Sequence, residues 1–130
     1  MELHGTRGAE TFAGVEVTWR IQARGARSVV RAAPNRERFD ADQVGPRVLL
    51  RHWRPGDRFQ PSGLRKPVKL QDLFTNAKIP AVARRRMLVA EAADGRIFWV
   101  EGLRMAEQFK LTGLTRRQLE WRWSRVKKLF

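Results

Sequence analysis

The sequence predicts a β-rich α+β domain of two packed sheets, with a short helix near its middle and a basic helix at its C-terminal end. Three observations lead to this fold class. Apolar and polar residues alternate in short segments, one stretch changes to helical periodicity, and Asp94-Gly95 marks a tight hairpin. With 130 residues, 42% of them hydrophobic, the chain is long enough for one domain with its own core.

The N-terminal part is expected to form strands. Residues 1–9 are small and polar, and we expect a flexible lead or the cut end of a linker there. Between residues 15 and 21, apolar and polar side chains alternate with a period of two, which indicates a strand with one buried face. After a turn, residues 28–32 can return as a second strand. Residues 38–42 are expected to be short and extended.

The middle of the chain changes from strand to loop to helix. Residues 48–53 form a more continuous apolar run, as expected of a strand covered on both faces. Three prolines, two glycines and several charges between residues 55 and 67 predict a loop. Apolar residues at positions i, i+3 and i+4 then predict a short helix over residues 69–77.

Pro80 ends that helix, because the residue before a proline is pushed toward extended geometry. Residues 81–86 can form another turn or two of helix. Residues 87–92 and 97–100 predict a hairpin, since the Asp-Gly pair between them supplies the positive backbone angles of a tight turn.

The C-terminal segment is expected to be a helix. Thr115 and Gln118 have the spacing of a capping box. Apolar residues follow at helical spacing among many cations, at Leu119, Trp123, Val126 and Phe130. The sequence therefore predicts a domain over residues 10–113 with a basic amphipathic helical extension over residues 114–130.

The charge of the chain indicates a polyanionic partner. Lys and Arg number 27 against 13 acids, for a net charge of +14. Such a chain repels itself unless its basic face meets a polyanion. Arginine predominates, and its planar fork fits phosphate oxygens. Most of the charge lies in strand and loop sequence rather than on an amphipathic membrane helix, so we expect nucleic acid and no membrane as the partner.

The sequence also indicates the cellular compartment. The chain has no cysteine, so it has no disulfide framework and no thiolate metal site. No apolar run reaches the roughly 18 residues of a membrane span. The first residues lack the pattern of a secretory signal. We therefore expect a cytoplasmic protein.

No residue pattern indicates catalysis. Asp40 and Asp42 could share a strand face as a metal-binding or acid–base pair, but acids before a turn are common for solubility and turn formation. His4 and His52 are far apart and lack a partner at ligand spacing. The spacing of a phosphate-binding loop is also absent. We expect no catalytic residue, no metal and no cofactor in this chain, which by itself is not an enzyme.

The basic residues concentrate between residues 47 and 86. This segment has eleven cations and two acids, a charge of +9, in a loop shaped by proline and glycine. Such a loop can present arginine forks to phosphates with little loss of entropy. A solvated surface is the alternative interpretation. Asp57 and Asp72 are expected to orient the cations through charge-assisted hydrogen bonds.

An ordered set of motifs in this region resembles the C-terminal domain of tRNA(Ile)-lysidine synthetases. The resemblance covers residues 37–112. Its main motifs are Phe39-Asp40-Ala41-Asp42, Arg54-Pro55-Gly56-Asp57-Arg58-Phe59, Pro61-Ser62-Gly63, Val68-Lys69-Leu70-Gln71-Asp72-Leu73-Phe74, Lys78-Ile79-Pro80, Ile97-Phe98-Trp99-Val100, Gly102-Leu103-Arg104 and Phe109-Lys110-Leu111-Thr112.

The resemblance implies a fold and a function. The fold would be that of a part of the phenylalanyl-tRNA synthetase β-subunit, and the domain would hold the acceptor stem of the tRNA. A separate N-terminal catalytic domain, with ATP and Mg, would ligate lysine to the wobble cytidine. The candidate RNA-binding residues, from the family pattern and the basic segment together, are Arg51, Arg54, Asp57, Arg58, Lys66, Lys69, Asp72, Lys78, Arg84, Arg85 and Arg104.

Two alternatives stay open at this point. The chain could be a stand-alone basic RNA-binding module with no synthetase attached. It could also be an assembly domain that binds another protein or the rest of its own enzyme, and a homodimer is compatible with the sequence.

Overall fold

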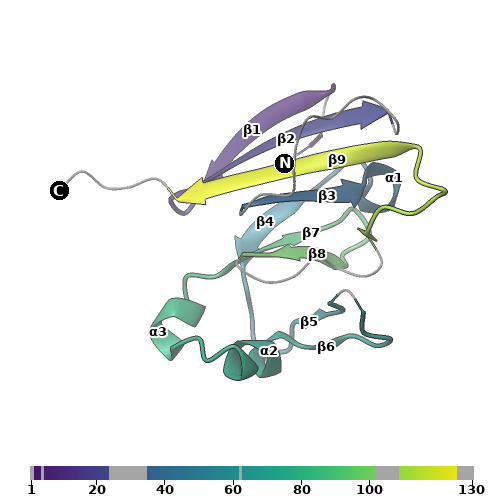
Figure 1. Cartoon of the computed structure of the whole chain (residues 1–130). Coiled ribbons are helices and arrows are strands. Elements are labelled where there is room, and N and C mark those ends of the chain that lie inside the picture. Colours follow the sequence, from purple (N-terminus) through teal and green to yellow (C-terminus); the bar gives the residue numbers. More distant parts are fainter. Residues whose placement is uncertain (1, 4, 24–34, 62, 102–108, 126–130) are drawn as a thin grey trace.

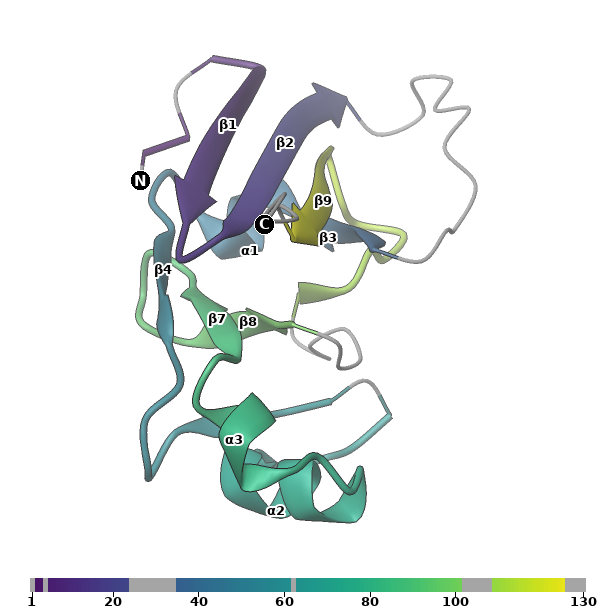
Figure 2. The same cartoon turned by 90° about the vertical axis from the view of Figure 1, so that its left-hand side faces the viewer.

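The elements of the protein stack in three layers (Figure 1). The computed structural model describes residues 2–3, 5–23, 35–61, 63–101 and 109–125. A four-stranded sheet forms the top layer of the view, a three-stranded sheet lies beneath it, and a two-stranded hairpin with two short helices forms the bottom. Figure 2 shows the same stack after a quarter turn. The β-rich α+β class is confirmed.

The top sheet is antiparallel and has the strand order β1-β2-β9-β3. Its strands are β1 (Arg7–Phe12), β2 (Val15–Ala23), β9 (Arg117–Arg125) and β3 (Arg36–Asp40). The alternation expected between residues 15 and 21 is confirmed, because every second side chain at the start of β2 is buried. The short helix α1 (Ala41–Val44) follows β3 directly.

The expectation of a flexible lead over residues 1–9 is wrong for its described part. Residues 7–9 belong to β1 and pair with β2. Leu3 is buried in the core, and its backbone N–H donates to the carbonyl of Pro46 at 2.9 Å. Glycine suits position 8 because a Cβ atom there would lie 2.6 Å from the Trp19 indole, too close for the two groups to coexist without a shift.

The expectation of a C-terminal helix is also wrong, because residues 117–125 form β9 in the centre of the top sheet. Leu119, Trp121 and Trp123 are all buried, a period of two that the helical interpretation missed. Thr115 does not cap a helix: its hydroxyl accepts from the Thr112 N–H at 2.9 Å and donates to Asp40 at 3.0 Å. Residues 126–130 lie outside the described residues.

The second sheet has the order β4-β7-β8, with strands β4 (Leu49–His52), β7 (Leu88–Glu91) and β8 (Ile97–Val100). The expected hairpin of β7 and β8 is confirmed, and Gly95 has the positive φ of 89° that its turn requires. The strand β4 is not covered on both faces as expected, since Leu49 is 50% exposed while Leu50 is buried.

The third layer contains the elements of the predicted loop and helix. Strands β5 (Arg58–Phe59) and β6 (Val68–Lys69) pair within the segment that the sequence assigns mainly to a loop. The expected short helix is confirmed as α2 (Leu70–Asn76), and α3 (Ala81–Arg84) follows Pro80. The proposed return strand over residues 28–32 lies outside the described residues.

Aromatic rings join the two larger sheets. The ring centroid of Trp121 on β9 lies 5.6 Å from that of Trp99 on β8 and 5.2 Å from that of Phe98. Phe39 of β3 meets Phe98 edge-on, with their ring centroids 4.9 Å apart. The expected packing of two sheets is therefore confirmed, with the small β5–β6 sheet as a third. Within the described residues, no helix combines the length and apolar character needed to cross a bilayer.

Candidate nucleic-acid interface

The third layer, residues 54–86, is called the basic lobe below. It begins with a turn over Arg54, Pro55, Gly56 and Asp57, in which Gly56 has a φ of 93°. Proline followed by a residue of positive φ is the arrangement of a type II turn. The Asp57 N–H donates to the Arg54 carbonyl at 3.0 Å, and the Arg54 N–H donates to the Asp57 carboxylate at 2.6 Å. Both ends of the turn are therefore tied together.

Arg51 on β4 anchors this turn to the body of the protein. Its two terminal nitrogens donate to the two Asp57 oxygens at 2.8 and 3.0 Å, and its Nε donates to Glu91 of β7. The Arg51 side chain is only 12% exposed and the Asp57 side chain 13%. A bidentate arginine–carboxylate pair fixes orientation as well as distance. The ion pair therefore sets where the lobe starts.

The protonation states agree with this geometry. Hydrogen bonding to Asp57 is the main cause that raises the pKa of Arg51 above its ordinary value. Burial alone would raise the pKa of Asp57, but the hydrogen bonds from Arg51 and the Arg54 backbone outweigh burial and hold that pKa below its usual range. Stability from this pair is present above the ordinary pKa of an aspartate and is lost as the pH falls through the lowered value.

The hairpin that follows places two cations side by side. Arg58 on β5 lies directly opposite Lys69 on β6, and both side chains are exposed. Like charges directly opposite in a sheet are unfavourable. The neighbouring pair, Phe59 and Val68, is apolar, and Phe59 is 2% exposed and anchors the hairpin in the core. The cations are thus held close together by the packing of their neighbours.

The helix α2 places Lys78 at its C-terminal end. Leu70 and Phe74 bury one side of α2, and Phe74 meets Trp53 edge-on at 5.1 Å. Lys78 follows the helix with a φ of 56°, a conformation that favours glycine, and its side chain is exposed. This backbone conformation closes the helix, because the N–H groups of Lys78 and Ile79 donate to the carbonyls of Thr75 and Phe74, both at 3.0 Å.

The structure divides the candidate RNA-binding residues into groups. Six cations are exposed and make no ion pair with a carboxylate in the described part of the chain: Arg54, Arg58, Lys66, Lys69, Lys78 and Arg85. Asp72 is exposed in the first turn of α2, and the expectation that it orients a cation is not seen among the described residues. Arg104 lies outside the described residues.

The other three candidates are engaged within the protein. Arg51 and Asp57 bind each other, so Asp57 orients a cation as expected, but neither side chain is turned outward as a direct RNA contact requires. Arg84 is half-buried, and its Nε donates to the carbonyl of Ile79 at 2.7 Å. We assign these three residues to holding the lobe in shape.

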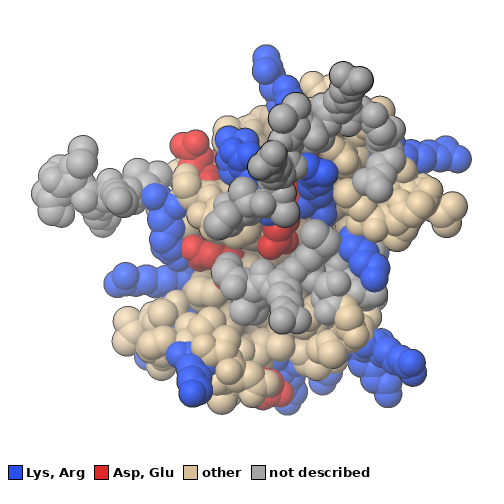
Figure 3. All heavy atoms as spheres, in the orientation of Figure 1, with Lys and Arg blue, Asp and Glu red and all other residues tan. Residues whose placement is uncertain are grey.

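Two further exposed cations of the lobe lie outside the candidate set. Arg65 lies in the loop between β5 and β6, and Arg86 follows α3. Both belong to the basic segment of the sequence but fall on none of the motifs that carry the resemblance. In the sequence, only their positive charge indicates that Arg65 and Arg86 could bind RNA. In the folded protein their exposure distinguishes them from Arg51. Figure 3 shows Lys and Arg side chains projecting from both ends of the lower layer.

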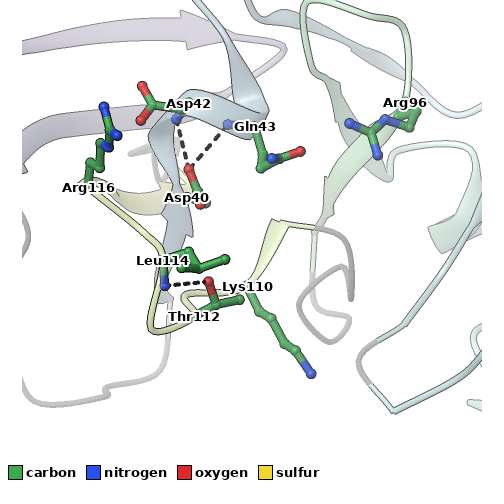
Figure 4. A pocket seen from close by; sticks show the side chains of 8 residues that line it. All are labelled: Asp40, Asp42, Gln43, Arg96, Lys110, Thr112, Leu114 and Arg116. Atoms are coloured by element: carbon green, nitrogen blue, oxygen red, sulfur yellow. Dashed lines mark hydrogen bonds between the residues drawn. The ribbon is translucent and has the colours of Figure 1, made fainter.

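The carboxylates considered for catalysis have structural partners. A pocket of about 570 Å³ lies between α1 and the segment before β9, lined by Asp40, Asp42, Gln43, Arg96, Lys110, Thr112, Leu114 and Arg116 (Figure 4). Asp40 accepts from the N–H groups of Asp42 and Gln43 and caps α1. Asp42 pairs with Arg117 at 2.7 Å. No group of three metal-ligating residues exists among the described residues.

The geometry of the basic lobe suits contact with phosphates. Its exposed cations stand on a turn, a hairpin and two helix ends that are anchored by buried rings and by the Arg51–Asp57 pair. Arginine and lysine on such a rigid surface position a nucleic-acid backbone without distinguishing its bases. Hydrogen bonds from arginine or lysine to a phosphate are charge-assisted and stronger than hydrogen bonds between neutral groups.

Comparison with known proteins gives a consistent result. A family model described as TilS substrate C-terminal domain matches residues 48–123. The tRNA(Ile)-lysidine synthase of Clostridium acetobutylicum is 38% identical over 82 residues, which are 63% of this chain and 18% of that protein. The protein of the same name from Geobacillus kaustophilus is 42% identical over 65 residues, 50% of this chain and 14% of that protein. The chain thus spans less than a fifth of these relatives.

Two solved structures share the fold. The crystal structure of a TILS C-terminal domain superposes with a TM-score of 0.76 at 24% identity, covering 98% of this chain and 97% of that chain. An N-terminal fragment of the phenylalanyl-tRNA synthetase β-subunit from Pyrococcus horikoshii has a TM-score of 0.59 at 14% identity, covering 72% of this chain and 28% of that chain. At these identities the likeness concerns the fold.

Proposed function

The chain belongs to the TilS substrate C-terminal domain family, and from this premise we propose that its basic lobe holds the acceptor stem of a transfer RNA. The family match over residues 48–123 confirms the resemblance seen in the motifs. It also extends into β9, beyond the residues that the motifs cover.

One observation supports this function above the others: six of the candidate cations of the lobe are exposed, and none pairs with a carboxylate of the described chain. They are Arg54, Arg58, Lys66, Lys69, Lys78 and Arg85. Two of them, Arg58 and Lys69, face each other across a hairpin. This like-charge pair is unfavourable in the free protein, and a bound polyanion relieves the repulsion.

The internal contacts of the lobe explain how binding would be strong enough to be useful. The Arg51–Asp57 pair and the buried Phe59 order the turn and the hairpin before RNA arrives. The entropy of ordering these groups is therefore lost on folding rather than on binding. The deep major groove of A-form RNA hides its base edges, so backbone contacts of this kind suit a stem.

We also propose the parent protein and its reaction from the relatives. The matched relatives are tRNA(Ile)-lysidine synthases, and this chain corresponds to a small part of them. The parent would ligate lysine to the wobble cytidine of an isoleucine tRNA in an N-terminal domain that binds ATP and Mg. In this arrangement the present domain places the substrate and supplies no reacting group. The compartment would be the cytoplasm.

The test is binding of the 130-residue chain to an isoleucine tRNA transcript, measured by fluorescence anisotropy. Arg54→Gln, Arg58→Gln and Lys69→Gln are combined in one variant. We expect the affinity to fall by at least about tenfold at low salt, because charge-assisted contacts to phosphate are lost. The melting temperature should stay the same or rise, since the like-charge pair of the hairpin is removed.

A matched control removes the same charge from cations that already have carboxylate partners. Arg47, Arg96 and Arg117 pair with Glu2, Asp94 and Asp42. A variant with all three changed to glutamine should lose far less affinity for tRNA than the variant with Arg54, Arg58 and Lys69 changed, which we call the lobe variant. Equal losses in the two variants would contradict the lobe as the binding site. An unmodified chain that does not bind tRNA at all would favour an assembly role within the parent protein.

A further inference from the structure

The outer face of the four-stranded sheet has a second group of cations. Val17, Trp19 and their cross-strand partners Trp123 and Trp121 point inward and pack toward β8. Because side chains alternate along a strand, the residues between them point to the opposite face. The register places five arginines on this outer face, which we call the arginine face: Arg7, Arg20, Arg36, Arg38 and Arg122.

Two cross-strand pairs on the arginine face have the same charge. Arg7 of β1 lies directly opposite Arg20 of β2, and Arg36 of β3 lies directly opposite Arg122 of β9. Directly opposite residues in an antiparallel pair have side chains about 5 Å apart, and like charges there are destabilising. A sheet selected for stability alone would place an acid at one position of each pair.

The acids near these arginines do not neutralise the face. Glu120 lies between Arg20 and Arg38 in one row, and its carboxylate also accepts from the Gln118 side chain at 3.5 Å. Glu16 lies in the row beside that of Arg122, and Asp40 lies in the row beside that of Arg38, where it caps α1. Among the described residues, none of the five arginines forms an ion pair, and the two rows that hold them contain one glutamate.

The remaining neutral side chains of the face are small or polar, and the row beside Arg20 holds Gln22 and the buried Gln118. Ala9, Thr11, Thr18 and Ser124 occupy positions in and beside the two rows, and none is a large apolar residue. The centre of a protein–protein interface is usually depleted of charge and enriched in aromatic residues. The arginine face lacks such a centre; Arg7, Arg20 and Arg122 are exposed on it, and Arg36 and Arg38 are half-buried.

We infer that the arginine face is a second site for an RNA backbone, separate from the basic lobe. This inference rests on the proposed function, since it assigns a further surface to the same class of partner. The two sites lie on different layers: the inner side of the top sheet packs on β8, and the lobe lies at the bottom of the molecule (Figure 1). Cations project from both layers in Figure 3.

The spacing of the arginines suits a polynucleotide. Neighbouring strands are about 4.8 Å apart and alternate residues of one strand about 6.7 Å apart, so the arginines form a grid within one face. Arginine forks in such a grid can each contact a phosphate and position a duplex or a backbone strand without reading its sequence. Bound phosphates remove the repulsion within each like-charge arginine pair. The free energy of binding is therefore more favourable than it would be for separated cations.

The test changes one arginine of each like-charge pair. Arg20→Gln with Arg122→Gln is compared with Arg47→Gln with Arg117→Gln, which removes the same charge from cations paired with acids. The probe is an isoleucine tRNA transcript, measured over a range of salt concentrations. We expect the first variant to bind at least about tenfold more weakly at low salt, with a log–log salt slope less steep by about 2.

The melting temperature distinguishes a binding role from a structural one. Removing the two repulsive pairs should leave the melting temperature of the Arg20 and Arg122 variant unchanged or raise it, while binding weakens. Unchanged affinity and slope would overturn the inference and assign the face to a protein surface of the parent. A loss of affinity no larger than that of the control pair would overturn it as well.

The two sites are distinguished by testing their variants side by side. Loss of binding in the lobe variant alone supports the proposed function and refutes the arginine face. Loss of binding in the Arg20 and Arg122 variant alone supports the arginine face and refutes the lobe. Losses in both variants support both sites.

Discussion

Arg51 and Arg54 are three positions apart in the sequence, but their side chains have different surroundings. Arg51 is 12% exposed and binds two carboxylates, whereas Arg54 is exposed and pairs with none among the described residues. Removing one partner of a partly buried ion pair leaves the other charge uncompensated. The position of a guanidinium relative to the core therefore decides whether it stabilises the fold or remains available to a ligand.

This difference predicts opposite outcomes for two similar substitutions. Arg51→Gln should lower the free energy of unfolding by about 2 kcal/mol, because Asp57 and Glu91 lose their cation. Arg54→Gln should change that free energy by less than about 0.5 kcal/mol and should still weaken tRNA binding. Urea unfolding and anisotropy titrations measure the two effects. If both variants are equally stable, the ion pair does not hold the lobe.

Glu37 gives a pH dependence at the same scale. It lies on the inner face of β3 opposite Trp121, and one of its carboxylate oxygens has no hydrogen-bond partner in the described chain. Burial raises the pKa of Glu37 from 4.5 to about 7. Between these values the folded carboxyl is protonated while the unfolded one is ionised, so stability falls as the pH rises through this window.

Glu37→Gln should remove this dependence. The variant should be more stable than the unchanged protein at about pH 8, by roughly 2 kcal/mol, and similar to it at about pH 4.5. Urea unfolding at the two pH values measures the difference. A parallel shift of both proteins with pH would show that Glu37 is ionised in the folded state.

At the scale of elements, β9 is the strand on which the top sheet depends. It pairs with β2 along nine residues and with β3 along five. Its inward side chains, Leu119, Trp121 and Trp123, are buried between the sheets. Burial of three such side chains contributes about 5–9 kcal/mol, which is similar to the whole stability of a typical domain.

A chain that ends at Gly113 should therefore not fold. Without β9, β2 and β3 lose their common neighbour, and the Trp99 and Phe98 rings lose the contacts to Trp121. Near-ultraviolet circular dichroism and thermal melting would show the loss of tertiary structure. A cooperative melt in the shortened chain would mean that residues 114–125 are an addition to a complete domain.

At the scale of the whole molecule, the charge of +14 predicts a steep salt response. If about six phosphates are neutralised, affinity for the tRNA transcript should fall roughly a thousandfold between about 50 and 200 mM salt. The slope of log affinity against log salt, measured by anisotropy, gives the number of phosphates. A flat response would contradict a phosphate-based mode of binding in either surface.

Features that depend on neighbouring residues could be predicted from the sequence. The spacing of apolar residues located β2, α2 and the β7–β8 hairpin, because each pattern follows from the geometry of one element. The charge excess indicated a polyanion, and the ordered motifs indicated the family, whose model matches the chain. These properties belong to short stretches of chain or to its composition.

Other features were decided only when distant segments came together. Leu119 and Trp123 are four apart and fit a helix, but with Trp121 they also fit a strand, and the neighbours β2 and β3 selected the strand. Arg51 differs from the other cations because Asp57 and Glu91 surround it, and Glu91 lies forty residues away. Burial, pairing and like-charge opposition are properties of contacts between segments, so one-dimensional patterns leave them undetermined.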